Sequence, residues 1–281
     1  MSPLITLLVL AAAVMHASWN ALIKAGKDKL VMQCLVMFFA GVPCLPFLFF
    51  VPLPAPASWP FLALSLAVHG VYYVTLINAY RFGALSQVYP IARGAAPLMI
   101  ALGAWAFAGE AMTLPEWAGV ILASAGIMSL AAPGKLPREE EAKAIGFALA
   151  TSITIALYSL ADGIGVRRAG ESTSYILWLL SLDAFPVMLA GLWLRRGRIA
   201  ASFRPHVAWA IVGGLLSALG YGIVIWAMGK APLAHVSALR ETSVILAAII
   251  GTVLLGQPFG RRRILAAVLV AAGNGLLHIA G

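Results

Sequence analysis

Four charged side chains lie inside apolar segments that are long enough to cross a membrane. They are Arg93, Asp183, Arg240 and Glu241, of which the last two are neighbours in the chain. With a rise of about 1.5 Å per residue, both arginines fall near the middle of a hydrocarbon core about 30 Å thick. An arginine at that depth costs roughly 2.5–3.5 kcal/mol on insertion scales. These charges therefore need a polar interior to face.

The types of these residues point to the binding of a small charged molecule. A guanidinium group offers a planar fork of donors that holds a carboxylate or a phosphate. A buried Asp or Glu can balance an ammonium group or pass a proton. Two cations and two anions suit a zwitterionic substrate, and they equally suit an internal network of ion pairs. The residue types leave both interpretations open.

Aromatic and amide side chains lie at similar depths in the expected helices. Trp19 and Asn20 share a helix face with His16, which suits a binding surface or a polar seam between helices. Tyr158 shares a face with Asp162, which we expect close to the membrane surface. The candidate substrate-binding residues are Trp19, Asn20, His69, Tyr73, Tyr89, Arg93, Tyr158, Trp178, Asp183, Arg240 and Glu241.

The sequence carries no signature of an enzyme. It lacks G-x-S-x-G, H-E-x-x-H, a P-loop and a paired cysteine motif. Its five histidines show no metal-ligand spacing, and Cys34 and Cys44 suit core packing. We therefore expect no catalytic residues, no cofactor and no metal. The alternative from another functional class is a membrane-embedded enzyme acting on lipid head groups. The polar residues of such an enzyme would lie near one membrane surface, whereas those of this chain are expected near mid-depth.

Composition places the chain among polytopic membrane proteins. Of its 281 residues, 62% are hydrophobic and 10% are charged, whereas a soluble domain carries about 25% charged residues. The net charge of +9 comes from short basic clusters between apolar runs. Such clusters are typical of loops on the cytoplasmic side of a membrane, and they argue against nucleic acid as a partner.

The apolar runs predict an all-α protein of ten transmembrane helices. The expected spans are 2–23, 31–51, 59–80, 84–107, 114–132, 144–164, 172–194, 206–228, 232–255 and 262–280. The polar stretch 133–143 separates five helices from five, and Arg138–Lys143 within it predicts a short surface helix. We therefore divide the chain into a unit 1–132, a linker 133–143 and a unit 144–281.

The two units resemble each other. At an offset of 147 residues, Arg93 meets Arg240, Gly109 meets Gly256 and Gly126 meets Gly273. Ala17–Asn20 likewise resembles Ala156–Ser159. An odd number of helices in each unit makes the second copy enter the membrane from the opposite side. Inverted repeats of this kind place a substrate site near the midplane, in a central cavity between the two copies.

The distribution of Lys and Arg predicts an orientation. Loops after the first, third, fifth, seventh and ninth helices hold 14 of these residues, and the opposite loops hold 3. The side with the excess is expected to be cytoplasmic, which places both termini on the outer side.

These duplicated segments resemble the drug/metabolite transporter superfamily. Within it the chain is most similar to the ten-helix EamA-type carriers, including the YddG-like amino-acid exporters. The residues that carry the resemblance are Ala17–Asn20 with Ala156–Ser159, Gly109-Glu110 with Gly256-Gln257, and Gly126 with Gly273. The resemblance implies a single chain of ten helices around a central cavity, exporting small metabolites by alternating access.

The chain departs from the family pattern at two points. Relatives often have Glu-Pro where this sequence has Glu241-Thr242, so the sequence alone does not predict a helix break there. Many ten-helix relatives keep both termini inside, whereas the charge count here places them outside.

The leading hypothesis is a multi-pass, monomeric exporter of amino acids in a bacterial-type inner membrane, with the small molecule and lipids as its partners. Arg93 and Arg240 would bind the carboxylate, and Glu241 or Asp183 would balance the amine or move protons. The rivals are a carrier of nucleotide-sugar, phosphorylated or drug-like compounds and a structural or regulatory subunit. A subunit of that kind would lack a central void of a few hundred Å³, which is the usual scale of a ligand site.

Overall fold

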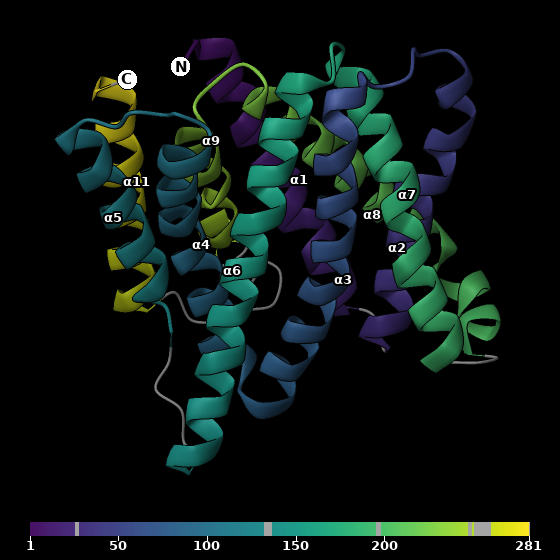
Figure 1. Cartoon of the computed structure of the whole chain (residues 1–281). Coiled ribbons are helices and arrows are strands. Elements are labelled where there is room, and N and C mark those ends of the chain that lie inside the picture. Colours follow the sequence, from purple (N-terminus) through teal and green to yellow (C-terminus); the bar gives the residue numbers. More distant parts are fainter. Residues whose placement is uncertain (26–27, 132–136, 195–197, 247–248, 250–259, 281) are drawn as a thin grey trace.

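The computed structural model describes residues 1–25, 28–131, 137–194, 198–246, 249 and 260–280, and within them every regular element is a helix (Figure 1). Eight of these helices are long and apolar enough to cross a membrane, and α5 is a shorter apolar helix. The all-helical membrane fold expected from the sequence is confirmed.

The helices follow the apolar runs closely. Their bounds are α1 Pro3–Ala25, α2 Lys29–Gly41, α3 Trp59–Phe82, α4 Leu85–Phe107, α5 Leu114–Met128, α6 Arg138–Arg168, α7 Ser172–Leu194, α8 Arg198–Met228, α9 Leu233–Arg240 and α11 Arg261–Ala280. The 3₁₀ segment η1 Val42–Phe49 continues the membrane span that begins with α2, so the helix expected over 31–51 is α-helical only to Gly41. Prolines in this segment, including Pro46, lack the N–H group that an α-helix would use. A second 3₁₀ segment, η2 Pro56–Ser58, precedes α3.

The prediction of a separate surface helix in the linker is wrong. Arg138–Lys143 forms the first turns of α6, which is 31 residues long and extends beyond the other helices at the end opposite the termini (Figure 1). The apolar stretch of α6 begins only after these turns, and Glu139 pairs with Lys143 across 2.9 Å. Good helix formers and this i,i+4 pair let the helix start before the apolar segment does.

The expected continuous helix over 232–255 is also wrong, because α9 ends at Arg240. Glu241 forms a turn and the chain is helical again over 242–246, while most of the remainder of this span lies outside the described residues. The Thr242 hydroxyl donates to the Leu239 carbonyl at 2.7 Å, across the turn at Glu241. The break forms here without a proline.

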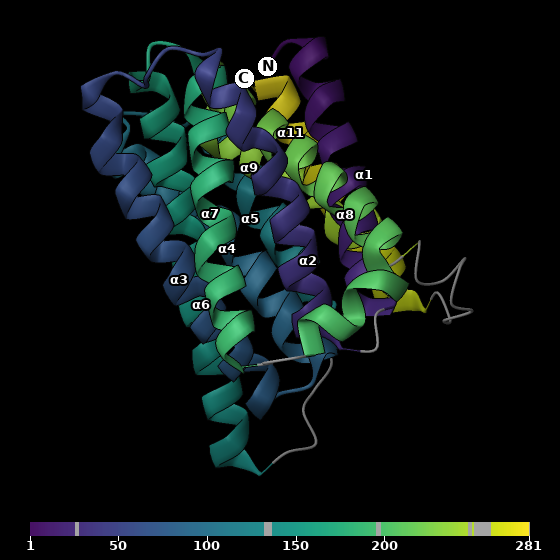
Figure 2. The same ribbon diagram turned by 90° about the vertical axis from the view of Figure 1, so that its right-hand side faces the viewer.

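The two halves of the chain pack mainly against each other. Extensive contacts join α3 with α6, α1 with α8, α2 with α7 and α8, α4 with α6, and α5 with α11. Figure 2 shows α2, α7 and α8 as neighbours on one side of the molecule. Both termini lie at the same end (Figure 1), as the even number of expected spans requires.

Glycines allow α5 and α11 to approach closely. A methyl group added at Gly119 would lie 2.8 Å from the Gly273 carbonyl oxygen, and one added at Gly126 would lie 2.8 Å from Leu269 Cβ. Small residues of this kind let helix backbones meet in a membrane, where association depends on close packing. Gly126 and Gly273, which the repeat pairs with each other, therefore have a packing role.

Candidate functional site

The first cluster of buried charge joins α4 to the end of α9. Arg93 Nε lies 2.8 Å from Glu241 Oε2, and Arg240 Nη2 lies 3.2 Å from Glu241 Oε1. The Glu241 side chain is fully buried, and both arginines are 5% exposed or less. One carboxylate thus stands between two guanidinium groups, which leaves one positive charge in excess.

The contact of Arg93 with Glu241 is an ion pair without an aligned hydrogen bond. Although the two atoms are close, neither Arg93 Nε nor Glu241 Oε2 makes a hydrogen bond of good geometry to the described residues. Arg93 Nη2 is likewise buried without a partner among them. A buried donor without an acceptor is costly, so this guanidinium has capacity for another anion.

Local sequence explains why α4 can carry Arg93 here. Pro97 has no N–H group, which removes the helical hydrogen bond to the carbonyl of Arg93 four residues earlier. Ser152 of α6 donates at 2.7 Å to the neighbouring carbonyl of Ala92. The helix around Arg93 is therefore held by α6 as well as by its own hydrogen bonds.

A small cavity adjoins this cluster. It has a volume of about 40 Å³, and it is lined by Ala12, His16, Arg93, Tyr158, Gly220, Tyr221, Val224 and Arg240. That volume is far below the roughly 300–1,000 Å³ of a ligand site. The expectation of a void of a few hundred Å³ beside the two arginines is therefore not met in this arrangement of the helices.

A second polar cluster also contacts Tyr158. The His69 ring of α3 stacks on Tyr158 of α6, with ring centroids 4.2 Å apart. His69 Nδ1 lies 3.7 Å from Asp183 Oδ1 of α7. Tyr158 also lines the cavity beside the two arginines, so one aromatic ring contacts both clusters.

Asp162 belongs to this second cluster, and sequence reasoning misplaced it near the membrane surface. It is fully buried and accepts hydrogen bonds from the hydroxyls of Tyr175 and Tyr221. Ser65 and His69 of α3 also lie close to its carboxylate. Asp162 lies deeper than expected because α6 ends at Arg168, four residues beyond the end of the expected span 144–164.

The other predicted site residues do not line the cavity. Trp19 packs in the apolar cluster of Cys34, Met37 and Val187, and the Asn20 amide donates to the His16 carbonyl of its own helix at 2.7 Å. These contacts suit packing as well as binding.

Three aromatic residues complete the set. The Tyr73 hydroxyl lies 3.8 Å from the sulfur of Met37, and Tyr89 packs against an apolar cluster around Val244. Trp178 packs edge-on against Trp59, and its indole N–H is buried without a partner in the described part of the chain. The structure thus brings Arg93, Tyr158, Arg240 and Glu241 together and leaves these aromatic rings around them.

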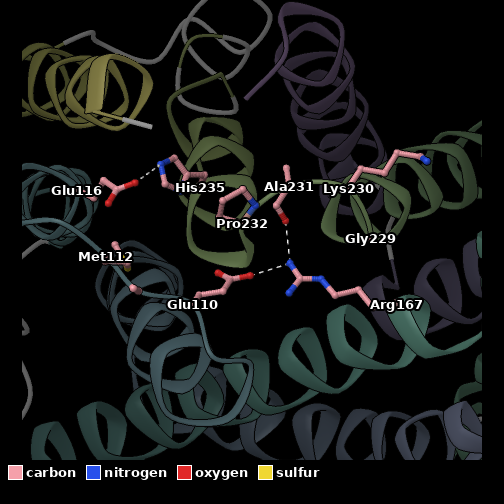
Figure 3. Close-up of a pocket in the computed structure, with 10 residues that line it drawn as sticks. Glu110, Met112, Glu116, Arg167, Gly229, Lys230, Ala231, Pro232 and His235 are labelled. Carbon is pink, nitrogen blue, oxygen red and sulfur yellow. Dashed lines mark hydrogen bonds and ion pairs between the residues drawn. The ribbon is translucent and has the colours of Figure 1, made fainter.

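A larger cavity lies at the end of the molecule where the termini lie, and its lining is drawn in Figure 3. Its volume is about 420 Å³, and Glu110 of the α4–α5 connection is one of the residues that line it. Glu110 accepts a hydrogen bond from Arg167 at 2.7 Å (Figure 3). It also accepts one from the backbone N–H of Leu233 at 2.9 Å. A carboxylate at a helix N-terminus is favourable, so Glu110 caps α9.

In the sequence, Gly109-Glu110 is recognisable as a repeated motif, but nothing there indicates that Glu110 caps α9. Gly109 has a φ of +68°, a conformation that glycine adopts at little cost and that turns the chain after α4. The Arg167 guanidinium also donates to the carbonyls of Met228 and Ala231. The turn, the cap and the ion pair together fasten α9 to α6 at this end.

The same cavity holds a contact between a histidine and a second carboxylate. His235 Nε2 lies 3.2 Å from Glu116 Oε1 (Figure 3). Glu116 also accepts hydrogen bonds from the backbone N–H and the hydroxyl of Thr113. Two carboxylates, those of Glu110 and Glu116, therefore line this cavity, and both already accept hydrogen bonds from groups of the protein.

Comparisons with known proteins identify the family. The sequence model of the EamA-like transporter family matches residues 3–132 and 142–278. The chain belongs to the EamA-like transporter family. A structure described as "Crystal structure of protein" has a TM-score of 0.78, covers 99% of both chains and is 17% identical. At that identity the likeness shows the fold alone, and no curated protein matches the sequence.

Membership of this family makes the chain a multi-pass membrane transporter of small solutes. The family consists of transporters, in agreement with the expectation that the chain is not an enzyme. The roles of the individual site residues stay predictions.

Proposed function

We propose that this protein exports small zwitterions, with amino acids as the substrates, by alternating access between the repeats 1–132 and 144–281. The observation that carries the proposal is the separation of buried charge into two clusters that both contact Tyr158. Arg93, Arg240 and Glu241 form one cluster, with excess positive charge, and Asp162 and Asp183 lie near His69 in the other. We call these the positive pole and the negative pole.

A zwitterion fits two opposite poles. The free N–H group of Arg93 would donate a charge-assisted hydrogen bond to the substrate carboxylate. The side chain of Asp183, 16% exposed, would accept the ammonium group. Both poles lie in apolar spans, where they interact strongly because water is excluded. The YddG-like amino-acid exporters, which the sequence resembles, would fit this substrate.

The small central cavity requires the helices to move before a substrate enters. A volume of about 40 Å³ holds no amino acid. Carriers built from inverted repeats open a fixed midplane site by rocking one group of helices against another. In this proposal, the cavity of about 420 Å³ at the terminal end lies on the route by which substrate leaves. That end faces outward if the Lys and Arg bias sets the orientation in a bacterial inner membrane.

The negative pole argues against phosphorylated and nucleotide-linked substrates. Such compounds carry several negative charges, and the positive pole has only one positive charge in excess. The carboxylates of Asp162 and Asp183 would repel them. A purely structural subunit would need no unpaired donor on Arg93, because a buried donor without a partner destabilises the fold.

The proposal is tested with purified protein in proteoliposomes loaded with unlabelled amino acids. Labelled amino acids added outside should enter by exchange, and sugar phosphates should not compete. Arg93→Gln should raise the KM for the amino acid by about tenfold or more, since it removes a charged hydrogen bond. Arg168→Gln is the matched control, because Arg168 lies at the exposed end of α6 over the Phe61 ring. If no amino acid exchanges above protein-free vesicles, the proposal is wrong.

A further inference from the structure

Asp162 is a buried carboxylate with an unusual set of neighbours. Its side chain is fully buried near the C-terminal end of α6, and it accepts hydrogen bonds from the neutral hydroxyls of Tyr175 and Tyr221. Within the described residues no Lys or Arg forms an ion pair with it. An isolated carboxylate in an apolar interior is costly while it is charged, and it is relieved by taking up a proton.

A titratable ring connects Asp162 to the partly exposed part of the negative pole. Ser65 and His69 lie close to the Asp162 carboxylate. The Ser65 hydroxyl is 3.4 Å from His69 Nδ1, and the same nitrogen is 3.7 Å from Asp183. Imidazole exchanges protons near neutral pH. Asp183, His69 and Asp162 therefore form a line of three proton acceptors that runs from α7 through α3 to α6.

The charges around this line come from all the elements that pack against it. Tyr72 of α3, Tyr158 of α6, Tyr175 of α7 and Tyr221 of α8 surround it with neutral rings. Beyond Tyr158 lie Arg93 and Arg240, with Glu241 between them. The positive pole keeps its own carboxylate, so His69 is the basic side chain that lies near Asp162 and Asp183.

We propose that Asp162 binds the proton that the protein exchanges for its substrate, and that His69 carries this proton between Asp162 and Asp183. The inference rests on the proposed function, since the negative pole is where the substrate ammonium would bind. A proton on Asp162 removes one negative charge from that pole and weakens its hold on the ammonium. Proton and substrate therefore exclude each other, and the proton returns to solution when the next ammonium binds.

The test compares exchange with proton-driven accumulation in the same proteoliposomes. At equal pH on both sides and saturating substrate, labelled amino acid should exchange in the wild type and, with a raised KM, in Asp162→Asn, because Asn mimics the protonated carboxyl group and leaves Asp183 to bind the ammonium. With an acidic lumen, the wild type should accumulate the amino acid several-fold above equilibrium, and Asp162→Asn should lose this accumulation. A pH-sensitive dye in the lumen should report substrate-induced proton loss in the wild type alone.

Two further variants keep the inference falsifiable. Glu171→Gln, at the exposed α6–α7 turn, is the carboxylate-to-amide control and should behave as the wild type. If Asp162→Asn does not fold, Tyr175→Phe removes a single hydroxyl from Asp162, and half-maximal accumulation should move by about one pH unit toward higher pH.

The outcomes separate the two proposals. Gradient-driven accumulation by Asp162→Asn, exchange in the wild type without accumulation, or a parallel loss of exchange and accumulation in the variant would each overturn a coupling role. A wild type that exchanges no amino acid at any pH would overturn the proposed function and this inference with it.

Discussion

Arg93 and Glu241 meet across the two halves of the chain, with Nε and Oε2 2.8 Å apart, although Glu241 also has an arginine beside it in sequence. The carboxylate is shared between Arg93 of α4 and Arg240 of α9, because α9 ends at Arg240 and turns at Glu241. A regular helix would direct neighbouring side chains about 100° apart. The break therefore allows one acid to serve both cations.

Removing the charge of Glu241 should destabilise the protein strongly. Glu241→Gln leaves two guanidinium groups buried without their shared anion, and breaking a buried pair costs about 3–5 kcal/mol. Thermal unfolding in detergent, followed by tryptophan fluorescence, measures the effect. Glu140→Gln on the exposed first turns of α6 is the control and should leave the midpoint unchanged. Equal midpoints for the two variants would contradict a central role of Glu241 in the cluster.

Weakening the cap on α9 should have a smaller effect. Glu110→Gln loses the ion pair with Arg167 and the charge that favours the N-terminus of α9, which together contribute about 1–2 kcal/mol. The unfolding midpoint should fall less than in Glu241→Gln and more than in Glu171→Gln. High salt should reduce the difference, because Arg167 is 29% exposed. A variant as stable as the wild type would show that the cap is dispensable.

Two glycines of α11 should respond oppositely to the same substitution. A methyl group at Gly273 would meet the backbone of α5, whereas nothing lies within 4 Å of one at Gly275. Gly273→Ala should destabilise by about 1–3 kcal/mol through overpacking. Gly275→Ala should be neutral or stabilising by up to about 1 kcal/mol, because Ala favours helix. The thermal unfolding midpoints of the two variants test this difference. An equal fall in both midpoints would show that α11 tolerates no added methyl group at either position and would contradict the prediction.

The orientation in the membrane is open to direct labelling. In a background with Cys34→Ala and Cys44→Ala, Ser2→Cys should react with a membrane-impermeant maleimide in intact cells. Glu140→Cys should react only after permeabilisation, because the basic loops stay on the cytoplasmic side. The reverse pattern of labelling would show that the Lys and Arg bias does not set the topology of this chain.

Sequence predicted the helices well because lipid forces each span to satisfy its backbone within one helix. The length of the apolar run was therefore sufficient to predict helices such as α3 and α7. It failed at α9, where the break depends on a side-chain hydrogen bond from Thr242 that no hydropathy pattern reveals. It also failed at the start of α6, where polar residues continue a helix outside the apolar span.

The candidate site was only partly accessible to sequence. Buried charges need partners, which pointed to Arg93, Arg240 and Glu241 as a group. Two cations and two anions allow several pairings, however, and only the packing of α4 against α9 selects one. Asp162 was misjudged because its partners, Tyr175 and Tyr221, come from two other helices. Side-chain partners on distant segments leave no local signal.

The pairing of Arg93 with Glu241 has a consequence for how the chain is made. About 150 residues separate them, and at about 5–20 residues per second a ribosome needs roughly 8–30 s to add that length. Within the described structure, α4 has no acidic partner for Arg93 until Glu241 is synthesised. During nascent insertion α4 must therefore enter the membrane as a lone cation, with its remaining apolar residues outweighing the cost of Arg93.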